Sequence, residues 1–122
     1  MASENKILGK KGEEAAARHL SNSGYIVLER NVRTPAGELD LVASRGEYLV
    51  FVEVKTRRGR RHGLPEEAIT PRKKKHLLES AQYFLQESGR MDQPWRIDVV
   101  AIEYGPRGIM ERIEVFENAV SG

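Results

Sequence analysis

Three residues with the chemistry of a phosphodiester-cleaving site lie close together in the sequence, namely Asp40, Glu53 and Lys55. Glu53 and Lys55 directly follow residues 48–52, which are all apolar and predict a strand through the core. Side chains two positions apart on a strand share a face, so Glu53 and Lys55 are expected about 6.6 Å apart along it. A charge buried there costs several kcal/mol unless it is paired or bound to a metal.

A second acidic strand is predicted beside the first. Residues 38–44 alternate in polarity, with Glu38 and Asp40 on one face. A tight turn after this strand brings Asp40 beside Glu53. Two carboxylates with water suit Mg²⁺ or Mn²⁺, and the nearby Lys55 ammonium can orient a water or oppose charge on a phosphate. The alternative is an ion pair of Lys55 with either carboxylate, which contributes under about 1 kcal/mol at a surface.

Basic residues are concentrated in one third of the chain. Residues 55–76 contain nine Lys or Arg and two Glu, a net charge of +7, whereas the whole chain carries +2. This concentration is expected of a surface that binds a polyanion, although a solvated loop and helix start can look the same. Arg30 and Arg33, which precede the acidic strand, suit either phosphate contacts or pairing with Glu38 and Asp40. The predicted nucleic-acid-binding residues are Arg30, Arg33, Arg57, Arg58, Arg60, Arg61, Lys73 and Lys74.

Seven helices and strands are predicted around these residues. Apolar residues every three or four positions mark the helices, and β-branched or aromatic runs mark the strands. Ser3 is expected to cap the first helix and Thr70, followed by Pro71, the second. A long loop over residues 57–70 contains His62, which is expected to be solvated. In chain order the elements are a helix over residues 4–22, strands over 25–28, 38–44 and 48–56, a helix from 71, and strands over 96–103 and 109–116.

The order αβββαββ indicates a single α/β (α+β) domain over residues 1–122, with a mixed sheet flanked by helices. Hydrophobic residues make up 39% and charged residues 31% of the chain, as in globular proteins. No apolar run reaches the roughly 18 residues that span a bilayer, and the N-terminus lacks the apolar core of a signal peptide. The absence of cysteine excludes disulfides, zinc–thiolate sites and thiol catalysis. Cytoplasm is the expected compartment, with no membrane partner.

Several short motifs resemble those of the YraN family of small bacterial proteins. That family is similar in turn to the PD-(D/E)XK restriction-endonuclease-like superfamily, and most closely to archaeal Holliday-junction resolvases. The resemblance covers nearly the whole chain. The motifs are residues 9–13 (GKKGE), 24–25 (GY), 30–33 (RNVR), 37–42 (GELDLV), 51–57 (FVEVKTR) and 96–101 (RIDVVA).

The resemblance implies a restriction-endonuclease-like core and metal-dependent cleavage of DNA. The superfamily's Asp, Glu and Lys fall on Asp40, Glu53 and Lys55, and the first-helix Glu of the resolvases falls on Glu13. From position alone, Glu13 could equally stabilise the start of its helix. Where the superfamily has a proline before the Asp, this chain has Leu39. Resolvases cut two strands symmetrically as dimers, so the same analogy implies a homodimer.

Three functions are compatible with these features. The first is an endonuclease that uses Mg²⁺ or Mn²⁺ to hydrolyse DNA phosphodiesters, on branched DNA in repair or recombination. The second is a non-catalytic nucleic-acid-binding module on the same fold, and the third is an interaction protein without nucleic acid. Asp40, Glu53 and Lys55 together favour the first over the second, because carboxylates weaken simple binding to phosphates. The basic segment favours either of these over the third.

Overall fold

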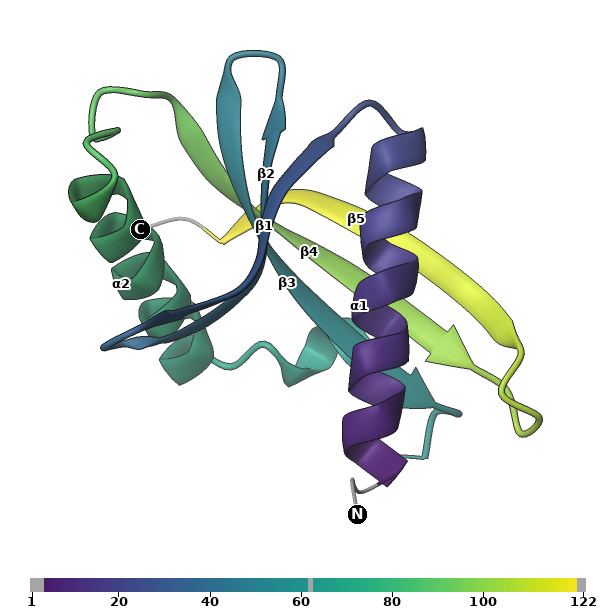
Figure 1. Cartoon of the computed structure of the whole chain (residues 1–122). Coiled ribbons are helices and arrows are strands. Elements are labelled where there is room, and N and C mark those ends of the chain that lie inside the picture. The colour runs from purple at the N-terminus through teal and green to yellow at the C-terminus, as the bar shows by residue number, and fades with distance from the viewer. Residues whose placement is uncertain (1–3, 62, 121–122) are drawn as a thin grey trace.

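A five-stranded sheet lies between two helices in the computed structural model, which describes residues 4–61 and 63–120 (Figure 1). The predicted cap Ser3 and the loop residue His62 lie outside the described residues. The elements, in chain order, are α1 (Glu4–Asn22), β1 (Ile26–Thr34), β2 (Gly37–Arg45), β3 (Tyr48–Arg58), the short 3₁₀ helix η1 (Pro65–Ala68), α2 (Pro71–Glu87), β4 (Trp95–Tyr104) and β5 (Met110–Val120). Apart from η1, this is the predicted order αβββαββ, so the α+β fold class is confirmed.

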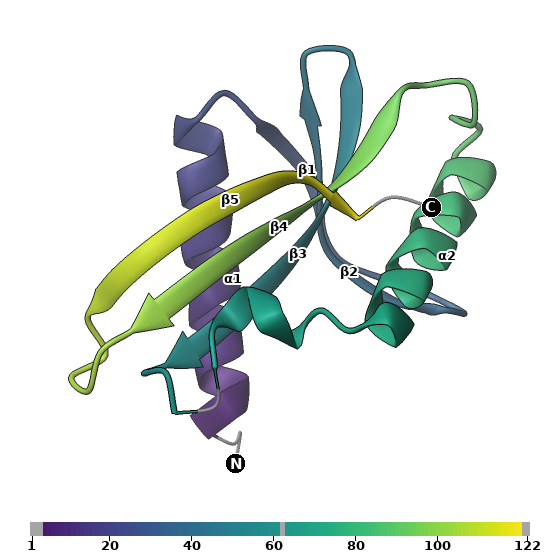
Figure 2. The ribbon, with the colours of Figure 1, turned by 180° about the vertical axis from the view of Figure 1, so that it is seen from behind.

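The sheet is mixed, as expected. Its strand order is β1-β2-β3-β4-β5, and every neighbouring pair is antiparallel except β3 and β4, which run parallel. The parallel pair needs a crossover connection, which α2 supplies. Figures 1 and 2 show α1 against one face of the sheet and α2 against the other. This is the arrangement expected of a restriction-endonuclease-like core.

Each helix covers its face with a stripe of apolar side chains. On the α1 side, Ala16 and Leu20 are fully buried in a cluster with Val50 and Val52 of β3. On the α2 side, Leu77, Ala81 and Leu85 are buried with Leu49 and Phe51 of the same strand. β3 is therefore apolar at consecutive positions because both of its faces are covered. None of the described helices is long and apolar enough to span a membrane.

Three predicted boundaries were wrong. The last strand was expected to end at residue 116, but β5 continues to Val120. The other two errors lie earlier in the chain. The first strand was expected to end at residue 28, but β1 continues to Thr34, so Arg30 and Arg33 lie within a strand and do not flank a turn. Residues 30–34 of β1 are mostly polar and exposed, and backbone pairing with β2 holds them in place. The second error concerns residues 57–70, where β3 extends to Arg58 and η1 forms. The predicted start of α2 is confirmed, because Thr70 Oγ1 accepts a hydrogen bond from the Lys73 N–H at 3.1 Å.

Candidate metal centre and nucleic-acid interface

The two predicted metal ligands lie side by side at the point where β2 and β3 separate. The last registered pair of these strands is Leu41 with Val52, so the next residues outward, Asp40 and Glu53, face each other. Asp40 Oδ2 accepts a hydrogen bond from the Val54 N–H at 2.8 Å, which fixes the carboxylate across the gap. Glu53 is 3% exposed. The strand geometry therefore places a buried carboxylate, Glu53, beside a half-buried one, Asp40, at the open end of the hairpin.

Burial and the neighbouring carboxylate make Asp40 hard to ionise. Burial, followed by the hydrogen bond and the negative charge of Glu53, raises the pKa of Asp40 to about 9, although the Val54 N–H lowers it. The negative charge of Glu13 also raises the pKa of Asp40, by a smaller amount. Two carboxylates this close hold a proton between them at neutral pH unless a cation compensates their charge.

The donor set fits a hard divalent cation. Glu53 Oε2 is buried and has no aligned hydrogen-bond donor among the described residues, although Lys73 Nζ lies 3.1 Å away. Within residues 4–61 and 63–120, no group of three or more acidic or histidine side chains forms a preassembled metal cage. Mg²⁺ usually binds through one or two carboxylates and keeps several waters. Asp40 and Glu53 are the residues that would hold such an ion.

Glu13 approaches the pair from α1. In the orientation that its neighbours require, the Asn31 amide nitrogen donates to Glu13 Oε1 at 2.9 Å and to Glu38 Oε1 at 3.0 Å. Burial raises the pKa of Glu13, and the negative charges of Glu38 and, to a smaller extent, Glu53 raise it further. The hydrogen bond from Asn31 lowers this pKa. Glu13 and Glu38 thus form a second, more exposed acidic pair next to the first.

Two lysines flank the carboxylates in different ways. Lys55 lies two residues beyond Glu53 on the same face of β3 and is half-buried. Lys55 forms no ion pair with a described carboxylate. The alternative in which Lys55 pairs with Asp40 or Glu53 is therefore not seen among the described residues. Lys73, at the start of α2, provides the cation nearest Glu53. Lys55 is therefore available for a phosphate or a water, whereas Lys73 partly neutralises the buried acid.

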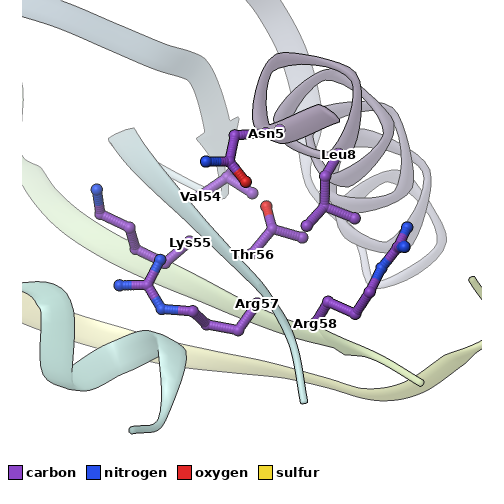
Figure 3. Close-up of a pocket in the computed structure, with 8 residues that line it drawn as sticks. Asn5, Leu8, Val54, Lys55, Thr56, Arg57 and Arg58 are labelled. Carbon is purple, nitrogen blue, oxygen red and sulfur yellow. The ribbon is translucent and has the colours of Figure 1, made fainter. Parts of the chain in front are cut away.

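The remaining predicted nucleic-acid contacts divide into two groups. Arg57 and Arg58 continue β3 beyond Lys55 and line a hollow beside the site (Figure 3). Arg61 and Lys74 are exposed at the surface, and so is Arg33. The other two predicted contacts are engaged by carboxylates: Arg30 pairs with Glu14 at 3.2 Å, and Arg60 pairs with the buried Glu103 at 2.7 Å.

Sequence reasoning missed Asn31 and the contact between Lys73 and Glu53. Asn31 adopts a left-handed backbone conformation, with φ of 52°, and from there its amide reaches both Glu13 and Glu38. Asparagine tolerates this conformation better than most residues, which is the only signal in the sequence. Lys73 was identified as a phosphate contact, but its approach to Glu53 depends on how α2 packs on β3. Linear spacing does not reveal that contact.

Comparison with known proteins places the chain in a family. The family model described as "Uncharacterised protein family UPF0102" matches residues 12–102, which include all four acidic-site residues Glu13, Glu38, Asp40 and Glu53. A UPF0102 protein of Pelotomaculum thermopropionicum is 48% identical over 119 residues, covering 98% of this chain and 99% of that protein. A UPF0102 protein of Symbiobacterium thermophilum is 49% identical over 115 residues, covering 94% and 97%. The chain therefore belongs to the UPF0102 (YraN-like) family.

Proposed function

We propose that the protein is a divalent-metal-dependent DNA endonuclease. The observation that carries the proposal is the pairing of the half-buried Asp40 with the buried Glu53, beside a basic strand end that suits a phosphate chain. Burial of two like charges is costly, and a fold retains them more readily where a metal ion compensates them. The substrate proposed from the resemblance to resolvases is branched DNA in repair or recombination, processed in the cytoplasm.

Each residue has a distinct part in this proposal. Asp40 and Glu53 hold the ion, and Mg²⁺ or Mn²⁺, when bound, would lower the pKa of a water and neutralise charge on the phosphate. Lys55 orients the attacking water or stabilises negative charge on the phosphate. Glu13, held by Asn31, positions water on the opposite side of the carboxylate pair. A homodimer would let two such sites cut two strands of a symmetric branch.

The test is a cleavage assay on branched, single-stranded and duplex DNA with Mg²⁺ or Mn²⁺. Asp40→Asn and Glu53→Gln should each lower the rate by about two to four orders of magnitude. Metal-free DNA binding should stay equal or become tighter in both variants, because neither substitution adds negative charge or removes a positive one beside the basic strand end. Lys55→Ala should also abolish cleavage, but it should weaken binding slightly because it removes a positive charge.

The assay also separates the competing functions. If the wild type binds DNA in a salt-sensitive way but cleaves no substrate with either metal, the chain is a non-catalytic binding module. If Asp40→Asn cleaves as fast as the wild type, the activity belongs to another site or to a contaminant. If the wild type neither binds nor cleaves nucleic acid, an interaction protein is the remaining interpretation.

A further inference from the structure

A basic hollow lies next to the carboxylate pair, between the N-terminal end of α1 and the outer end of β3. Its volume is about 580 Å³. Figure 3 shows Lys55 and Arg57 projecting to one side of the strand and Thr56 and Arg58 projecting towards α1. None of its described lining residues is acidic or aromatic; they are Asn5, Leu8, Gly9, Val54, Lys55, Thr56, Arg57 and Arg58.

The hollow follows a free edge of the sheet. β3 pairs with β2 only as far as Val52, whereas on its other side it pairs with β4 as far as Arg58. Consecutive side chains of a strand point to opposite faces, so a hollow that contacts five consecutive residues must run along the strand edge. The outer half of β3 therefore presents both of its side-chain rows to the same hollow, along an edge that no strand pairing with β2 covers.

Two cations in the hollow have no counter-charge in the described structure. Neither Lys55 nor Arg57 forms an ion pair with a described carboxylate. The Nε atom of Arg57 is buried and has no hydrogen-bond partner among the described residues. Nearby arginines differ in this respect: Arg60 and Arg112 both bind Glu103, at 2.7 and 2.8 Å. A buried arginine N–H without an acceptor is unusual, and the guanidinium group that carries it is a strong donor to phosphate oxygens.

We propose that this hollow binds the phosphates of one unpaired DNA strand that leads into the Asp40–Glu53 site. Its volume is that of a small-ligand site, which suits one or two nucleotides of a single strand and is far too small for a duplex. Without aromatic residues in the lining, recognition is through the backbone and is independent of base sequence. Glu53, Lys55 and Arg57 recur every 6.6 Å or so along β3, close to the spacing of successive phosphates in an extended strand.

The inference deepens the proposed endonuclease function and rests on it, but binding can be tested without cleavage. In EDTA, fluorescence anisotropy would measure binding of a short single strand and of a blunt duplex of the same sequence. The wild type should prefer the single strand, and Arg57→Gln should weaken single-strand binding about tenfold. The slope of log affinity against log salt should fall by about 0.7 for the lost phosphate contact.

The matched control is Arg90→Gln, which makes the same substitution at an exposed arginine. Arg90 accepts a hydrogen bond from the Gln93 N–H, and Gln93 reaches the Glu47 carbonyl, so it lies at the opposite end of β3. This variant should bind single strands within twofold of the wild type. Equal losses for Arg57→Gln and Arg90→Gln would mean that only net charge matters, and the hollow would carry no site.

Single methylphosphonate linkages, which remove one phosphate charge, locate the contact. When one such linkage is moved along the strand, binding to the wild type should weaken at only one or two positions. Arg57→Gln should abolish the sensitivity at those positions. Uniform sensitivity along the strand, or tighter binding of the blunt duplex, would overturn the inference. Metal-dependent cleavage that Arg57→Gln leaves unchanged on single-stranded substrate would also overturn it, while leaving the proposed endonuclease intact.

Discussion

At the scale of single residues, the site is a problem of charge compensation. Asp40 and Glu53 lie side by side, and among the described residues Lys73 is the one cation within ion-pair distance, at Glu53. The Val54 N–H stabilises an ionised Asp40, but it does not outweigh burial and the neighbouring carboxylate. The metal-free site therefore stores a proton, and a divalent cation would displace it.

The raised pKa of Asp40 sets the pH dependence of stability in the metal-free protein. Its folded-state pKa of about 9 lies above the ordinary value of 3.8, so between these values the folded state holds a proton that the unfolded state has lost. The stabilising contribution is full below pH 3.8 and is lost as the pH rises through the folded pKa. Between pH 5 and 9, denaturant titrations in EDTA should show falling stability, and Asp40→Asn should flatten the profile.

At pH 8, Asp40→Asn should be more stable than the wild type by about 1–3 kcal/mol. Saturating Mg²⁺ should narrow this difference, because a bound cation compensates the ionised pair. Asp92→Asn is the control, since Asp92 is exposed and its substitution should leave the profile unchanged. Parallel profiles for the wild type and Asp40→Asn would show that Asp40 is ionised normally.

At the scale of elements, the sequence predicted most boundaries, since α1, β2, β3 and the start of α2 have strong apolar periodicity or caps. The hairpin register of β2 and β3 followed from their tight turn, and with it the meeting of Asp40 and Glu53. β1 was predicted too short because its outer half is held by backbone pairing and lacks an apolar pattern. The contacts of Lys73 and Asn31 depend on tertiary packing and a left-handed residue, which local patterns do not encode.

α1 approaches β3 closely near the site, at Gly12. A Cβ at Gly12 would lie 2.5 Å from Thr56 Oγ1 and 2.9 Å from Thr56 Cγ2, so any side chain there must push the helix or the strand aside. Gly12→Ala should cost about 1–3 kcal/mol of folding stability. It should also slow cleavage, because Glu13 is the next residue on α1. Thermal or denaturant unfolding and the cleavage rate are the measurements.

The same helix offers a matched control and a rescue. Gly9 has nothing within 4 Å of an added Cβ, so Gly9→Ala should be neutral or stabilise the protein by about 0.5–1 kcal/mol. Thr56→Ala removes the two nearest atoms, and in the Gly12→Ala background it should recover much of the loss. Equal effects of Gly9→Ala and Gly12→Ala, or no rescue, would show that the close approach does not set the position of α1.

At the scale of the whole molecule, two groups of buried charge lie near opposite ends of α1. The carboxylate pair and the basic hollow lie near its N-terminal half, whereas Asp98 is fully buried with Tyr25, just beyond its C-terminal end. Asp98 accepts hydrogen bonds from the Tyr25 hydroxyl at 2.7 Å, from Arg96 at 3.0 and 3.2 Å, and from the Asn118 N–H at 2.8 Å. This acid is fully satisfied by protein donors, so we interpret it as structural.

The contrast between Asp98 and Asp40 gives the sharpest test of the whole arrangement. Asp98→Asn replaces an acceptor of four hydrogen bonds by an amide that turns two donors towards Tyr25 and Arg96, so it should cost about 3–5 kcal/mol. Asp40→Asn, the same change on the same sheet, should instead raise metal-free stability at pH 8. The increase in melting temperature on adding Mg²⁺ should persist in Asp98→Asn, if the variant remains folded at low temperature, and should vanish in Asp40→Asn. Tyr25→Phe, which removes one of the four donors at a cost of about 1–2 kcal/mol, keeps the comparison available if Asp98→Asn does not fold. If Asp98→Asn and Asp40→Asn both lose the Mg²⁺-induced increase in melting temperature, the cation acts on global folding and has no site at Asp40 and Glu53.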